Sequence, residues 1–244
     1  MSSDDVVGGA TPEERMLKRL SGYSDFQLIA RWNEIIRIVK DELTSLNLER
    51  QFMQETVEIL NGNERFLRHP GRQFVDYARS WYGNSMAAAY RRQTDSNSDS
   101  ASLRVLLEEI KYRPTAYRFE TLHPFMPDAP RELVESEVMS IAGASGASGI
   151  DVKIVQADLD LLTSTGKNVR DFVNKHLAHT DRKKRTKPIQ ATFDEIHAAQ
   201  QTCEEIAKRW VIVFTGANTS FDVITLFDWH DVFDFPWRAR KNGN

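Results

Sequence analysis

A long run of apolar residues at helical spacing constrains the fold of this chain most strongly. Leucine, isoleucine, valine and tryptophan recur every three or four positions over five turns, and mostly polar residues fill the positions between them. The apolar set comprises Leu28, Ile29, Trp32, Ile35, Ile36, Val39, Leu43 and Leu46. Ser24 and Gln27 have the spacing of a capping box before this run, and Asn61-Gly62-Asn63 ends the pattern. The spacing therefore predicts one long amphipathic helix between these signals.

The same period recurs along the rest of the chain, and no stretch alternates with the period of two that a half-buried strand requires. A second long helix is predicted from about Arg72, with a buried stripe of Phe74, Tyr77, Ala78, Trp81, Ser85, Ala88 and Ala89. Shorter helices are predicted over 103–110, 132–142 and 152–162, and a last long helix over 193–215 between a capping box and Gly216. The sequence predicts an all-α fold, an antiparallel helical bundle with short accessory helices.

The loop and helix-ending residues between the predicted helices indicate one domain with two extensions. Residues 1–10 are expected to be disordered, residues 11–215 to form a single helical-bundle domain, and residues 216–244 to form an aromatic-rich C-terminal tail that packs on the bundle or on a partner. Four of the eight prolines lie in 114–130, which predicts a surface connection. The run 143–149 is typical of a flexible linker; a phosphate-binding loop is the alternative, but the lysine and preceding strand of such loops are missing.

Composition excludes several function classes. The formal net charge is −3, so contact with nucleic acid would require a local basic patch. The single cysteine, Cys203, rules out an internal disulfide and favours a reducing compartment. No apolar run approaches the roughly 20 residues that cross a bilayer, and the first residues are acidic where a signal peptide is basic. We expect a cytoplasmic protein without membrane contact.

The chemically richest stretch is 169–185. Its apolar positions predict a helix with one buried face, and the polar residues include Arg170, two histidines (His176 and His179) and a basic run after them. Two imidazoles near a guanidinium can hold and protonate a phosphate. The alternative is that both histidines are packing side chains. A metal site that includes Asp181 lacks an obvious fourth ligand, so no metal and no cofactor are predicted.

Two segments carry a resemblance to a known family. A polar loop followed by Ser-Leu-Arg-Val-Leu-Leu (102–107), and Asn-Lys-His-Leu-Ala-His-Thr-Asp (174–181) before a capped helix, resemble the HEPN superfamily and within it the AbiU-type abortive-infection branch, over about residues 25–215. The resemblance implies a helical bundle that commonly forms homodimers. Active members are metal-independent endoribonucleases, and their signature is an arginine, a polar residue and a histidine four to six residues after the arginine.

The signature fits this sequence in two registers. By spacing alone, Arg170 and Asp171 with His176 satisfy it. By the identity of the surrounding residues, His179 is the family histidine and Asn174 is the polar residue. Val173 then occupies the arginine position. The second register is preferred because both Asn174 and the alanine before His179 match. The charge would then come from Arg170 or Lys175.

The departure at Val173 leaves two functions open. The first is a metal-independent endoribonuclease or RNA-targeting toxin, in phage defence or a toxin–antitoxin system, with Arg170, Asn174, His176 and His179 as catalytic residues. In this hypothesis RNA phosphates are bound by Lys175, Arg182, Lys183, Lys184 and Arg185. Since one ideal helix separates Arg170 from His176 by about 120°, a homodimer would have to complete the site. RNA and a cognate antitoxin are then the expected partners. The second function is a non-catalytic helical scaffold that binds a protein or RNA.

Overall fold

The computed structural model describes residues 11–62, 64, 71–144, 149–177, 191–221 and 229–230, with only the backbone of residues 12, 176 and 177. Within these ranges every regular element is helical and no strand occurs, which confirms the predicted all-α fold. The predicted positions of the helices are also confirmed. Residues 1–10 and most of the aromatic tail lie outside the described ranges.

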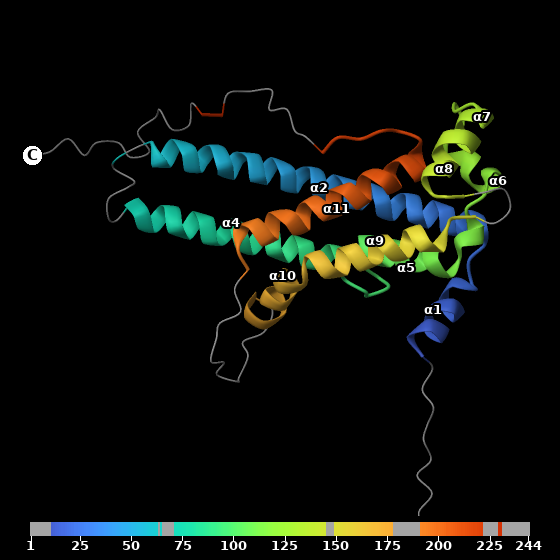
Figure 1. Ribbon diagram of the computed structural model, residues 1–244, viewed down its shortest axis with the longest axis horizontal. Helices are drawn as coiled ribbons and strands as arrows, with labels where there is room; N and C mark the ends of the chain where they lie inside the picture. Colours follow the sequence, from blue (N-terminus) through green and yellow to red (C-terminus); the bar gives the residue numbers. More distant parts are fainter. Residues whose placement is uncertain are drawn as a thin grey trace, which may run out of the picture.

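Five longer helices form the body of the molecule. Helix α2 (Asp25–Asn61) runs along its length, and α4 (Gly71–Gln93) lies antiparallel beside it (Figure 1). Helix α5 (Leu103–Tyr112) continues roughly in the line of α4 after a short loop, and α9 (Val152–Thr165) packs on α5. Helix α11 (Phe193–Thr215) lies across α2, α4 and α9 and so joins both halves of the bundle.

Shorter elements occupy the ends and one side of this body. They are α1 (Pro12–Leu20), η1 (Pro114–Ala116), α6 (Phe119–Leu122), η2 (His123–Phe125), α7 (Arg131–Leu133), η3 (Val134–Val138), α8 (Met139–Ile141), α10 (Lys167–Phe172) and η5 (Val173–Leu177). The proline-rich 114–130 segment is not purely a surface connection, because Ala116, Tyr117, Leu122 and Met126 are buried in it. Its prolines instead limit the helices here to short turns, and these turns cover one end of the core.

The helix ends follow from local chemistry in the sequence. Ser24 with Gln27, and Thr192 with Glu195, form reciprocal capping boxes at the starts of α2 and α11. Helix α11 ends at Gly216, whose φ of 67° lies in the left-handed region that favours glycine. These signals are local, which is why sequence reasoning located them.

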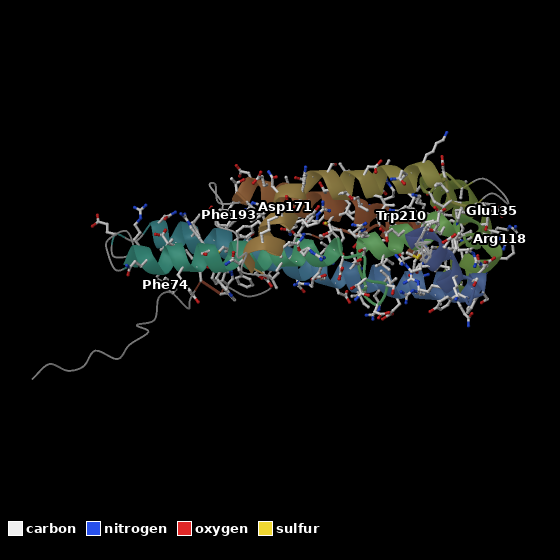
Figure 2. All side chains as sticks on the ribbon, turned by 90° about the horizontal axis from the view of Figure 1, so that it is seen from below. Phe74, Arg118, Glu135, Asp171, Phe193 and Trp210 are labelled. Carbon is white, nitrogen blue, oxygen red and sulfur yellow. The ribbon has the colours of Figure 1, made fainter. Side chains whose placement is uncertain are left out.

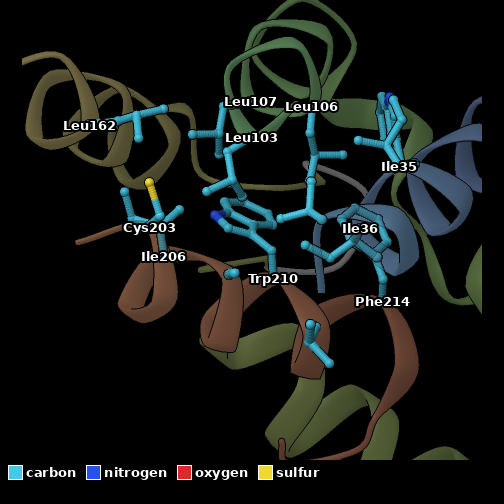
Figure 3. Close-up of a cluster of buried hydrophobic side chains, with 14 of the residues drawn as sticks. Ile35, Ile36, Leu103, Leu106, Leu107, Leu162, Cys203, Ile206, Trp210 and Phe214 are labelled. Atoms are coloured by element: carbon cyan, nitrogen blue, oxygen red, sulfur yellow. The ribbon is translucent and has the colours of Figure 1, made fainter. Parts of the chain in front are cut away.

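Two buried tryptophans anchor the centre of the core (Figure 3 shows Trp210 with Phe214 and the leucines of α5). Each indole N–H is satisfied by a buried carboxylate: Trp32 donates to Glu109 over 3.1 Å, and Trp210 donates to Asp158 over 2.8 Å. A buried donor without an acceptor would lower the free energy of unfolding by roughly 1–3 kcal/mol. The two carboxylates therefore fix how α5 and α9 pack against α2 and α11.

The predicted buried face of α4 is wrong in its first half. Phe74, Tyr77 and Trp81 are 52%, 72% and 70% exposed (Figure 2 labels Phe74). A second apolar stripe that includes Val75 and Tyr82 faces the core instead. Helix α4 carries apolar residues on both stripes, and the bulkier stripe is the exposed one. Because α11 begins only partway along α4, fewer of the described helices lie beside the first turns of α4.

Candidate functional site

The segment that carries the HEPN-like motif starts with a glycine that permits close packing. Gly166 ends α9 and begins the turn into α10, directly against the ring of Tyr90 on α4. A Cβ atom on Gly166 would lie 1.9 Å from Cζ of Tyr90, far inside van der Waals contact. The Tyr90 hydroxyl donates to the carbonyl oxygen of Leu162 in the last turn of α9. This arrangement presses α10 onto the C-terminal half of α4.

After α10 the helix widens into a π turn over Val173–Leu177. Turns of this kind are rare and occur frequently at functional sites. Val173, which occupies the arginine position of the preferred register, is only 5% exposed and packs in the core. A guanidinium at this position would have to be buried, so the valine is consistent with its surroundings. Asn174, the next residue, is partly exposed.

A cation from another helix contacts the asparagine of the motif. Arg91, in the last turn of α4, donates from Nε to Oδ1 of Asn174 over 3.0 Å. Its Nη1 lies 3.5 Å from a carboxylate oxygen of Asp95, and about a third of its side chain is exposed. An arginine therefore contacts the polar residue of the motif, although it comes from a helix 83 residues earlier in the sequence.

The two cations that the sequence offered in place of Val173 lie on the motif segment itself. Lys175 pairs with Asp171 one turn earlier, with Nζ 3.4 Å from Oδ2. Arg170 is partly exposed and makes no ion pair within the described part of the chain. Burial raises the pKa of Tyr90, and the charge of nearby Arg170 opposes this shift in smaller part. Arg170 thus lies close to the Tyr90 contact that positions α10.

The other end of the motif loop is held at the start of α11. Asn168 on α10 donates to Oε1 of Glu195 over 2.7 Å, and this hydrogen bond is the main cause of the lowered pKa of the Glu195 carboxyl. Figure 2 shows Asp171 and Phe193 in this region, where α10 meets the start of α11. Five residues predicted from the sequence to belong to the site lie between Asp171 and Phe193 but outside the described residues. They are His179, Arg182, Lys183, Lys184 and Arg185.

Of the predicted catalytic residues, Arg170 and Asn174 have described side chains, and His176 has only its backbone described, in the π turn. Among the residues with described positions, no three His, Cys, Asp or Glu side chains are grouped so that they could hold a metal ion. No helix in the described ranges combines the length and apolar character needed to cross a membrane.

Arg91 is the residue that sequence reasoning missed. The sequence shows it only as one of two arginines, Arg91 and Arg92, near the predicted end of α4. Arg92 forms an ion pair with Glu42 of α2, whereas Arg91 contacts the motif. Which arginine contacts the motif depends on the rotation of α4 about its axis, and the sequence pattern misjudged that rotation.

The comparisons with known proteins agree with this architecture. No curated protein and no solved structure matches the chain significantly. The family described as HEPN AbiU2 matches residues 33–235, which includes most of α2, all of α4, α5, α9 and α11, the π turn Val173–Leu177 and the motif segment. With most of its length matched, the chain belongs to the AbiU2 family of HEPN proteins.

Proposed function

We propose that this protein is a metal-independent endoribonuclease of the abortive-infection type, acting on RNA in phage defence or within a toxin–antitoxin pair. The observation that carries the proposal is the contact between Arg91 and Asn174. This contact places a guanidinium next to the polar residue of the HEPN-like motif. The motif itself has no arginine there, because Val173 occupies the arginine position. The match to the HEPN AbiU2 family supports the same reading.

The arrangement suits cleavage by an internal 2′-hydroxyl. In such a reaction the 2′-oxygen attacks the adjacent phosphorus, the P–O5′ bond breaks, and negative charge builds on the phosphoryl oxygens. Arg91 uses Nε on Asn174 and directs Nη1 towards Asp95, which leaves Nη2 without a partner among the described side chains. That nitrogen is available to a phosphoryl oxygen. We assign the proton transfers to the motif histidines, with His179 preferred.

The remaining cations would guide RNA to this point. Arg170 and Lys175 lie on the same segment as Asn174, and the basic run Arg182–Arg185 follows in the sequence. Positive side chains near a cleavage site attract the phosphate backbone without reading its sequence. We further propose a homodimer, in which Arg170 of one subunit serves the site of the other.

Cleavage of total RNA in the presence of a metal chelator tests the proposal directly. We expect the wild-type protein to cleave, and Arg91→Ala to reduce the rate by roughly 10²-fold or more, as loss of one transition-state donor does in other enzymes. Arg92→Ala is the matched control, because Arg92 is the next residue along α4 but pairs with Glu42 of α2, whereas Arg91 contacts Asn174. His179→Ala tests the proton-transfer assignment in the same assay.

The second candidate is a non-catalytic scaffold, and it is favoured by a single observation, the buried Val173 at the signature arginine position. A preparation that binds RNA but never cleaves it, with or without added metal, would support the scaffold. Cleavage that is equally fast in Arg91→Ala and Arg92→Ala would exclude Arg91 from the site.

A further inference from the structure

A cavity of about 680 Å³ lies between α1, α5 and α9 and has no part in the proposed reaction. Its walls come from α1, from the loop 96–98 between α4 and α5, from α5 itself, and from the outer face of α9. This volume lies within the range of roughly 300–1,000 Å³ that is typical of small-molecule sites. The loop wall is well fixed, because the carbonyl of Ser98 accepts a hydrogen bond from Arg31 over 3.0 Å.

The cavity is lined by four cationic side chains and two carboxylates, in a protein whose net charge is negative. Arg104 is paired with Glu108 over 2.7 Å, and the carboxylate of Asp160 accepts a hydrogen bond from Gln156. Arg15 and Lys111 form no ion pair with any described residue. Among the described residues the lining therefore has two unpaired cations, Arg15 and Lys111, against one unpaired carboxylate, Asp160, and is positive on balance.

Arg19 lines the cavity and also takes part in the buried Glu109 cluster. One of its terminal nitrogens, Nη2, donates to Glu109 over 2.8 Å. The other, Nη1, is buried and has no hydrogen-bond partner in the described structure. Glu109 also accepts hydrogen bonds from Arg31, so one carboxylate serves two guanidinium groups. One carboxylate shared by two guanidinium groups leaves a net positive charge, and the partly exposed Arg19 side chain adds this charge to the cavity wall.

The rest of the lining suits a nucleoside. The ring of Tyr112 is partly exposed, and Nζ of Lys111 lies over this ring at 5.8 Å from its centre, so an aromatic surface and a cation occur together on the cavity wall. Ser96, Asn97 and Thr163 offer hydroxyl and amide groups to a ribose. We propose that this cavity binds a nucleoside phosphate, with the base on Tyr112 and the phosphate towards Lys111 and Arg15.

The same chemistry could be presented by a free mononucleotide or by one nucleotide of a single-stranded RNA. The cavity is connected to the Arg91 site through Asp95, which faces Arg91 Nη1 and also accepts a hydrogen bond from the backbone N–H of Asn97 over 3.3 Å. The binding site goes beyond the proposed cleavage and does not require it.

The test is a direct binding measurement on the full-length protein, with two probes in parallel. One probe is AMP, followed by calorimetry; the other is a fluorescent single-stranded 2′-O-methyl oligoribonucleotide, which cannot be cleaved by its own 2′-oxygen. The variants are Lys111→Ala, Arg15→Ala and Tyr112→Ala, with Tyr112→Phe to retain the ring. Lys18→Ala is the matched control, since Lys18 is an exposed cation on α1 that does not line the cavity.

We expect Lys111→Ala and Tyr112→Ala each to weaken binding by about 10-fold, and Tyr112→Phe and Lys18→Ala to leave it within about 2-fold. Weaker binding of the oligonucleotide alone identifies an RNA subsite, and weaker binding of AMP as well identifies a mononucleotide site. The proposal is overturned if neither probe binds, or if Lys111→Ala binds as tightly as Lys18→Ala. Because the readout is binding, this result is independent of whether Arg91→Ala stops cleavage.

Discussion

At the scale of single residues, Glu109 connects three neighbouring helices, α1, α2 and α5. Its carboxylate is fully buried on α5 and accepts hydrogen bonds from Arg19 of α1 and from Arg31 and Trp32 of α2. We expect Glu109→Gln to destabilise the protein by about 3–5 kcal/mol, because a neutral amide leaves two guanidinium groups without their counter-charge and directs its own donors at other donors. Thermal unfolding should show a melting temperature lower by roughly 10 °C.

Glu108, the residue before Glu109, provides the control variant. Glu108 pairs with Arg104 in the i,i+4 arrangement on a partly exposed face, and such pairs contribute only about 0.2–0.5 kcal/mol. Glu108→Gln should therefore unfold close to the wild-type temperature. Equal melting temperatures for the two variants would contradict a structural role for Glu109.

At the scale of elements, Gly166 decides whether the motif segment can approach α4. Its φ of −100° is open to any residue, so the requirement for glycine is one of space. We expect Gly166→Ala to destabilise the protein by roughly 1–3 kcal/mol, because the Tyr90 ring is buried and cannot move away from the added methyl group. Since α10 would have to shift, the Arg91–Asn174 contact should break and RNA cleavage should fall with stability.

Gly62→Ala separates this effect from the general consequence of replacing a glycine. A Cβ atom there would meet backbone oxygens at 3.5 Å, an ordinary contact. Chemical denaturation of both variants, with cleavage measured at a temperature where both are folded, gives the comparison. A Gly166→Ala protein with wild-type stability and cleavage would show that the close approach of α10 and α4 is not required.

The elements also show what the sequence could and could not predict. Helix positions, capping boxes and the Gly216 terminus depend on residues within a few positions of each other, and they were predicted. The rotation of α4 was not predicted, because apolar residues occur on both of its stripes and the contacts with α2, α10 and α11 select the buried one. The same rotation brings Arg91 to Asn174, so the cation of the candidate site could not be predicted from motif spacing.

At the scale of the whole molecule, the motif segment packs where the line of α4 passes into α5, at the side of an elongated bundle (Figure 1). Arg91 and Asn174 are brought together within one chain, so the site needs no partner for that contact. Arg170 has no ion pair in the described part of its own chain and remains available for the site of a second subunit. A shared site of this kind is consistent with the proposed homodimer.

Subunit mixing tests the shared site, and it rests on the proposed cleavage activity. Arg91→Ala and Arg170→Ala should each be poorly active, but equal amounts, unfolded and refolded together, should recover roughly a quarter of the wild-type rate. Half of the dimers are then mixed, and each mixed dimer has one site with its own Arg91 and the partner's Arg170. A mixture of Arg91→Ala with Asn174→Ala should recover nothing, because both residues serve the site of their own chain. If the first mixture stays as inactive as its parents while light scattering shows dimers, Arg170 acts within its own subunit.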